Sequence, residues 1–206
     1  MKKNILSFGA IVEQAIQKSI AALRERRSEL ASEVIEGDRL IDAREVEIEE
    51  ACLKLLALHQ PVADDLRFVA AVLKTNNELE RIADYAVNLA ERAAFLAPLP
   101  PLPVPVQLDE MTEATLGMLR ESLDAFVRRD PAAARKVCVT DDEVDRLNVD
   151  LIAKLRRMME ADPQTIERAL HLFSASRYLE RIADLATNIA EDVVYMVNGE
   201  IIRHGG

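Results

Sequence analysis

The amino-acid sequence predicts an all-α protein made of two tandem, similar three-helix bundles joined by a proline-rich linker. Half of the 206 residues are apolar, only 4% are aromatic and six are glycine, a composition typical of helices rather than sheets. The hexapeptide LERIAD occurs twice, at residues 79–84 and 179–184. Between the copies, five of the eight prolines fall in APLPPLPVPV, residues 97–106, where a helix cannot continue. The predicted units are a first bundle over 1–97, a linker over 98–106 and a second bundle over 107–206.

Apolar residues at helical spacing predict three helices in each half. The predicted ranges are 5–30, 34–59 and 62–96 in the first half, and 108–128, 131–160 and 164–197 in the second. Pro61, in HQPVADD, separates the second helix from the third, because proline ends one helix and begins the next. Pro131 follows Asp130 and Pro163 follows Asp162, which predicts acidic N-caps with proline at the first helical position.

The repeat extends beyond the hexapeptide. Between Leu79 and Glu91 the first copy agrees with the second at 10 of 13 positions. DRLID at 38–42 corresponds to DDEVD at 141–145, and each precedes its LERIAD by about 40 residues. A unit of roughly 95 residues is longer than the 20–50 residues of solenoid repeats, so a duplicated three-helix bundle is the simpler interpretation.

Acidic residues accompany the apolar face of the predicted helices at a spacing of four residues. At about 100° per residue, Asp84 lies about 40° from Glu80, beside the apolar face that contains Leu79 and Ala83. If the second and third helices of each half pack antiparallel, the acids of both helices flank one groove. The residues of the two predicted sites are Asp38, Asp42, Glu80 and Asp84 in the first half, and Asp141, Asp145, Glu180 and Asp184 in the second.

These repeated acid pairs predict metal sites. Like charges four residues apart destabilise an isolated helix by roughly 0.2–0.5 kcal/mol per pair. Because the chain repeats this unfavourable pattern, we infer that the acids bind a cation. Carboxylates are hard oxygen ligands that suit Mg²⁺, Mn²⁺, Ca²⁺ or iron, and they can bridge several ions. The alternative is a solvated helix surface on which Arg81 and Arg181 neutralise the nearby acids.

Charge and motifs disfavour several classes of function. A formal charge of −10 disfavours nucleic acid and anionic lipid as main partners. No GxxxxGK[ST], GxGxxG or GxSxG motif occurs, and none of the three histidines has the spacing of a zinc site, so we predict no enzyme activity. The alternative is a metal-dependent hydrolase of phosphate compounds. The sequence shows neither a signal peptide nor an apolar run of about 18 residues, which predicts a cytoplasmic protein, peripheral to membrane complexes at most.

The LERIAD segments and their surroundings resemble the PhoU family of bacterial phosphate regulators. Four segments resemble their PhoU counterparts, in order and over nearly the full chain: VIEGDRLID, LALHQPVADDLRFVAAVLKTNNELERIAD, SRYLERIADLATNIAED and VNGEIIRHGG. The resemblance implies two similar three-helix bundles with multinuclear metal clusters at E(D)xxxD motifs, which match the eight acids named above. The metals it implies are divalent or iron-type ions (Fe, Mn, Mg or Zn).

The resemblance also implies a regulatory function. PhoU-like proteins restrain the phosphate-starvation response and phosphate uptake when phosphate is plentiful. They act as adaptors that contact the ATPase subunit of a phosphate ABC transporter and a sensor histidine kinase. We therefore expect a non-enzymatic adaptor that forms a homodimer, binds no nucleic acid, and uses its metal sites to organise a protein-binding surface.

The sequence departs from the family pattern near the predicted sites. The glycine of the family's ERIGD is alanine in both copies, and Tyr85 and Leu185 stand where relatives often have histidine. Asn148 matches Glu45, so the second predicted site has fewer carboxylates than the first. We expect metal identity and occupancy to differ between the two halves.

Overall fold

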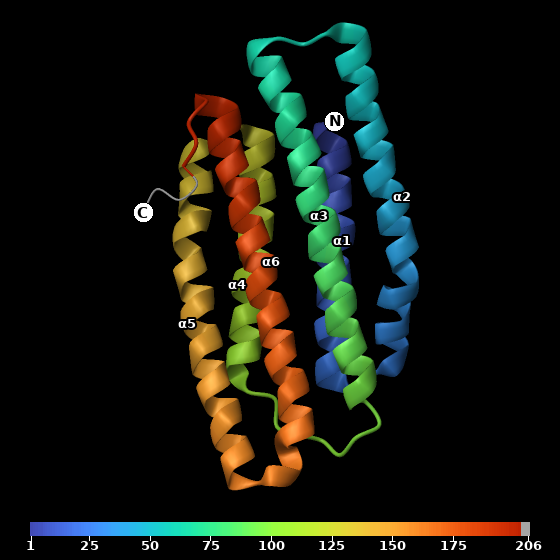
Figure 1. The fold of residues 1–206 in the computed structure, drawn as a ribbon, viewed down its shortest axis with the longest axis vertical. Coiled ribbons are helices and arrows are strands. Elements are labelled where there is room, and N and C mark those ends of the chain that lie inside the picture. The colour runs from blue at the N-terminus through green and yellow to red at the C-terminus, as the bar shows by residue number, and fades with distance from the viewer. Residues whose placement is uncertain (203–206) are drawn as a thin grey trace.

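The computed structural model describes residues 1–202 and consists of helices joined by short connections (Figure 1). The six long helices are α1 (Lys2–Glu25), α2 (Ser28–His59), α3 (Ala63–Leu96), α4 (Val106–Arg128), α5 (Pro131–Ala161) and α6 (Ile166–Asn198). One 3-10 turn, η1 (Pro163–Thr165), precedes α6. No strand occurs in the described part of the chain, and the predicted all-α fold is confirmed.

The helices form two three-helix bundles that lie side by side along their length (Figure 1). The first bundle is α1, α2 and α3, and the second is α4, α5 and α6. Helix α3 packs against α6, and α1 contacts α4, so the two halves share a long boundary. The connection from α3 to α4 crosses the lower end of the molecule in Figure 1, and the N-terminus and the end of α6 lie toward the upper end.

The predicted apolar face of the LERIAD helices forms part of the core. Ile82 and Ala83 of α3 are fully buried, and so are their counterparts Ile182 and Ala183 of α6. Full burial of an isoleucine side chain contributes on the order of 1.5–3 kcal/mol, and the small alanines allow the helices to approach closely. The repeated sequence therefore supplies both halves with the same buried surface.

Helices α1 and α4 approach closely at Gly9. A Cβ atom at Gly9 would lie 2.3 Å from Leu123 Cδ1, so any larger residue would force the leucine side chain to move. Inserting a methyl group into a packed contact typically costs about 1–3 kcal/mol. Gly9 thus permits the contact of α1 with α4 across the boundary.

The predicted acidic N-caps are present in the second half. Asp130 Oδ1 accepts hydrogen bonds from the backbone N–H groups of Ala132 and Ala133, each at 3.0 Å, and Pro131 is the first residue of α5. Asp162 accepts from the N–H of Gln164 at 3.0 Å. That second cap begins the 3-10 turn η1, and α6 begins at residue 166 rather than at the predicted 164.

The predicted break between the first two helices was misplaced. Helix α1 ends at Glu25 rather than at residue 30, and α2 begins at Ser28 rather than at 34. Arg26 adopts the left-handed conformation (φ 58°, ψ 41°), and its N–H bonds to the carbonyl of Ala22. Neither glycine nor proline marks this turn in the sequence, and a left-handed non-glycine residue is held by tertiary contacts rather than by local preference.

The histidines occupy unrelated places. His59 is exposed at the end of α2, and the His171 ring stacks on Phe95 with 3.9 Å between centroids. His204 lies outside the described residues.

Within residues 1–202, no helix has the length and apolar character needed to cross a membrane.

Candidate functional site

Helices α2 and α3 are joined at one end, run antiparallel and carry the acids predicted for the first half (Figure 1). Asp38 and Asp42 lie one turn apart on α2, and Glu80 and Asp84 lie one turn apart on α3. We call these four residues the first acidic cluster. Asp38 and Glu80 are half-buried while Asp42 and Asp84 are exposed, so the cluster flanks the core without filling it.

Helices α5 and α6 carry the corresponding acids of the second half. Asp141 and Asp145 lie on α5, and Glu180 and Asp184 lie on α6. We call these four residues the second acidic cluster. Asp141 and Glu180 are half-buried, and Asp145 and Asp184 are exposed, which reproduces the pattern of the first half.

Burial and mutual repulsion raise pKa values in the first acidic cluster. Burial is the largest cause of the raised pKa of Asp38, Glu80 and Asp84. The charge of Asp84 further raises the pKa of Glu80 along α3, and the charge of Asp42 on α2 raises the pKa of Asp84 on α3. The two helices therefore bring their carboxylates close enough to repel one another, and a bound cation would relieve that repulsion.

The same effects are large at Asp141 in the second acidic cluster. Burial, then Asp184 and Asp145, raise the pKa of Asp141 from an ordinary 3.8 to about 6. Burial is also the largest cause of the raised pKa of Glu180 and of Asp184. These carboxyls are costly to ionise together unless positive charge lies beside them.

The second acidic cluster has such a positive charge in Arg177. Its Nη1 lies 2.5 Å from Glu180 Oε1. The charge of Arg177 partly offsets the raised pKa of Glu180 and of Asp184, and Arg181 acts on Asp184 in the same direction. Arg177 is not among the predicted site residues. It could have been found in the sequence as a position at which the two copies of the repeat differ.

The first half has a different residue at that place. Asn77, which matches Arg177, is exposed and uncharged. Arg81, which matches Arg181, pairs with Glu78, with 3.0 Å between Nη1 and Oε2. Asn188 of α6 also donates to Glu78, at 3.5 Å, so this glutamate belongs to the boundary between the halves. The first acidic cluster therefore keeps more of its negative charge than the second.

Buried amides also distinguish the two sites. In the first half, Asn76 Nδ2 donates to the backbone carbonyl of Glu45 at 2.9 Å and to its side-chain Oε1 at 3.3 Å. In the second half, the match of Glu45 is Asn148, which is 3% exposed and whose Oδ1 has no hydrogen-bond donor among the described residues. Ser176, the match of Asn76, donates instead to the carbonyl of Phe173.

The donor set fits a hard metal ion. All eight predicted ligands are carboxylates, and Glu180 Oε2 and Asn148 Oδ1 are buried oxygens without a hydrogen-bond donor in the described part of the chain. As placed, no group of three or more Asp, Glu, His or Cys side chains within residues 1–202 is close enough to hold an ion. Metal binding would therefore require side-chain rotation, and both sites stay predictions.

Tyr85 belongs to the boundary between the halves. Its ring stacks on Tyr178 of α6, with 6.0 Å between centroids, and its hydroxyl accepts a hydrogen bond from Arg181 at 3.3 Å. Tyr85 thus joins α3 to α6.

Comparisons with known proteins find relatives over both halves. Residues 5–93 and 108–193 each match the PhoU domain. A phosphate-specific transport system accessory protein PhoU homologue of Aquifex aeolicus (strain VF5) is 42% identical over 203 residues, which cover 98% of this chain and 92% of the relative. The accessory protein PhoU of Escherichia coli (strain K12) is 36% identical over all of this chain and 86% of its own length. The crystal structure of PhoU from Pseudomonas aeruginosa superposes with a TM-score of 0.91 at 37% identity, covering 96% of this chain and 95% of that one.

Proposed function

We propose that this chain, which belongs to the PhoU family, is an accessory protein of a phosphate-specific transport system and a regulator of phosphate homeostasis. The observation that carries the proposal is its likeness, over both bundles, to relatives with that name. When phosphate is plentiful, the protein restrains phosphate uptake and the phosphate-starvation response.

The protein acts as an adaptor rather than as an enzyme. Relatives named as accessory proteins of a transport system support an association with the transporter. In the proposed arrangement, the protein lies in the cytoplasm and contacts the ATPase subunit of the phosphate ABC transporter. It couples the state of the transporter to a sensor histidine kinase through its long helical surfaces.

The two acidic clusters hold divalent or iron-type metal ions in this proposal (Fe, Mn, Mg or Zn). The raised pKa of Asp141 and the buried, donor-free oxygens of Glu180 and Asn148 support a role in binding cations. A bound ion would neutralise each groove and fix the relative position of the two helices that line it. The ions would thereby shape the surface that the adaptor presents to its partners.

The proposed active form is a homodimer without disulfides. Helix α2 supports an apolar contact between copies, because Leu40 and Leu58 lie on the same side of the helix and are 75% and 77% exposed. Light scattering at micromolar concentration should give a mass near twice the chain mass of 23.0 kDa. A mass of one chain at that concentration would contradict the dimer.

The regulatory proposal is tested in an Escherichia coli strain that lacks its own PhoU protein. Alkaline phosphatase activity in phosphate-rich medium should fall to the repressed level when this chain is supplied. The native PhoU protein of the strain is the positive control, and an empty vector is the negative control. Persistent activity, with this chain folded and present at the level of the native protein, would contradict the adaptor role.

A further inference from the structure

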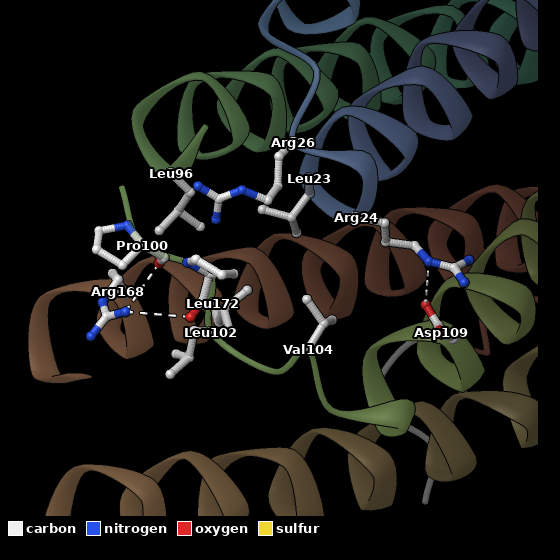
Figure 2. Close-up of a pocket in the computed structure, with 11 residues that line it drawn as sticks. Leu23, Arg24, Arg26, Leu96, Pro100, Leu102, Val104, Asp109, Arg168 and Leu172 are labelled. Carbon is white, nitrogen blue, oxygen red and sulfur yellow. Dashed lines mark hydrogen bonds and ion pairs between the residues drawn. The ribbon is translucent and has the colours of Figure 1, made fainter. Parts of the chain in front are cut away.

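A cavity of about 350 Å³ lies where the linker crosses between the two halves (Figure 2). The linker residues Pro100, Pro101, Leu102 and Val104 form one wall. The helices contribute Leu23 from α1, Leu96 from α3 and Leu172 from α6, each less than 10% exposed. Both halves and the linker are therefore needed to form this cavity.

The polar lining of the cavity is positive, in contrast with the chain as a whole. Arg24, Arg26 and Arg168 line it together with a single acid, Asp109 (Figure 2). Arg24 Nε lies 3.3 Å from Asp109 Oδ1, while Arg26 and Arg168 form no ion pair within the described residues. The cavity lining therefore carries a net positive charge, although the whole chain has a formal net charge of −10.

Two of these arginines hold the linker in place. Arg26 Nη2 donates to the carbonyls of Ala97, at 2.7 Å, and Leu99, and Arg168 Nη1 donates to the carbonyl of Pro100 at 3.0 Å. Carbonyl groups are neutral, so these bonds position the guanidinium groups without cancelling their charge. A guanidinium has five N–H donors, so each arginine retains donors beyond those used by the linker.

We propose that this cavity binds a small organic anion, with a carboxylate or phosphoryl group at Arg26 and Arg168, whose charges no acid among residues 1–202 offsets, and an apolar body against the leucines. Guanidinium groups recognise both kinds of anion by paired hydrogen bonds. Ligand sites typically combine apolar walls with a few placed polar groups in a volume of roughly 300–1,000 Å³, so this cavity suits a small ligand. The site is distinct from the acidic clusters and does not depend on the proposed regulatory function.

The direct test is a titration of the full chain with phenyl phosphate, followed through the NMR signals of leucine methyl groups. The methyl groups of Leu23, Leu96 and Leu172 should shift together and saturate at one ligand per chain. Benzoate should produce the same pattern if a carboxylate is accepted. Inorganic phosphate should need at least about tenfold higher concentration, because it lacks the apolar body, and benzylamine should produce no shift.

Two variants separate a built site from nonspecific binding. The variant Arg168→Gln should weaken phenyl phosphate binding by at least about tenfold, because it removes a charged group that no acid in the described part of the chain offsets. Arg128→Gln, at the opposite end of α4, makes a single charge change of the same kind away from the cavity, and it should alter the affinity by less than twofold. Circular dichroism establishes that each variant is folded.

Several results would overturn the proposal. In the unmodified chain, an absence of methyl shifts at high phenyl phosphate concentration would show that the cavity binds no such anion, whatever the variants do. Equal binding by Arg168→Gln would show that Arg168 only fastens the linker. Equal affinity for inorganic phosphate would show that the apolar body of the ligand does not contribute to binding. Equal shifts with benzylamine would show that the negative charge of the ligand does not contribute.

Discussion

The first acidic cluster keeps its negative charge, whereas the second is partly neutralised by its own chain. Arg177 pairs with Glu180 at 2.5 Å in the second half, and the matching position in the first half is the uncharged Asn77. Glu45 adds a carboxylate beside the first cluster, and its match beside the second is the buried amide Asn148. Two copies of one motif therefore have different electrostatic surroundings.

The repeated motif and its neighbouring residues set separate properties of each cluster. The ExxxD spacing places the carboxylates. Side chains within about one helical turn decide how much of the carboxylates' negative charge is already offset by positive charge. An ion entering the second acidic cluster must compete with Arg177, while an ion entering the first does not. We therefore expect the first acidic cluster to bind a divalent metal more tightly.

The largest effect should come from removing the carboxylates themselves. Glu80→Ala with Asp84→Ala should abolish the tighter Mn²⁺ site, with at least about a hundredfold loss of affinity, and Glu180→Ala with Asp184→Ala should abolish the weaker one. Calorimetric titration with Mn²⁺ measures both sites. Helicity should be nearly unchanged, because these side chains flank the core.

The unmodified chain and Glu121→Ala, an exposed acid of α4, are the references for that titration. If the first double variant retains both Mn²⁺ sites, the first acidic cluster is not a metal site. If both double variants remove the same Mn²⁺ site, either the tighter or the weaker one, the predicted order of affinity of the two clusters is wrong.

Exchanging the residues at positions 77 and 177 should alter affinity by about tenfold. Arg177→Asn should strengthen Mn²⁺ binding at the second acidic cluster, and Asn77→Arg should weaken it at the first. A charge a few ångströms away, largely screened by solvent, amounts to roughly 1.4 kcal/mol. Arg156→Asn, on the exposed surface of α5, is the matched control and should have no effect. Unchanged affinities in both exchanges would show that Arg177 does not compete with the metal.

The pH dependence of the metal-free protein should also distinguish the halves. Asp141 titrates near pH 6 in the folded protein and near 3.8 when unperturbed, so the folded state binds more protons between these values. Stability should therefore fall as pH rises from 4 to 6, by roughly 1 kcal/mol from this group after allowance for solvent screening. Urea unfolding at pH 4.5 and 7 measures the change. Asp141→Asn should reduce it, and an identical pH dependence in that variant would exclude Asp141 as the source.

The smallest effect should come from Glu45→Asn, which gives the first half the residue of the second. Removal of one nearby carboxylate should weaken Mn²⁺ binding at the first acidic cluster by about threefold, or about 0.6 kcal/mol. Asn76 keeps its hydrogen bond to the backbone carbonyl of residue 45, so the fold should be unaffected. Glu47→Asn, an exposed acid on α2 that pairs with Arg44, is the control. Equal effects of both variants would mean that only net charge matters.

Local patterns predict most of the helices but not the turn at Arg26. Proline and an acidic cap mark the start of α5 at residue 131, and the linker prolines mark the end of the first half. The left-handed Arg26 carries no such mark, and its side chain bonds to the carbonyl of Ala97, 71 residues away in the sequence. A turn held by a distant carbonyl cannot be read from local preferences.

The placement of the arginines shows the same limit within the candidate site. Arg177 and Arg181 both lie close enough along α6 to act on its acids. Arg177 forms an ion pair with Glu180, whereas Arg181 donates a hydrogen bond to the hydroxyl of Tyr85 in the other half, 96 residues away. The boundary between α3 and α6 thus decides which arginine partners Glu180.

The all-α class, the duplication, the proline-rich connection and the helices that carry the eight predicted acids can all be read from the sequence alone. These features rest on composition, on periodicity and on short repeated spacing, all of which act within a few turns of one helix. Three features come from the packing of the whole chain: the bundles lie side by side along α3 and α6, Asn148 is buried, and three arginines line a cavity beside the linker. These features depend on contacts between residues far apart in the chain, whose geometry follows from packing the whole molecule rather than from any one segment.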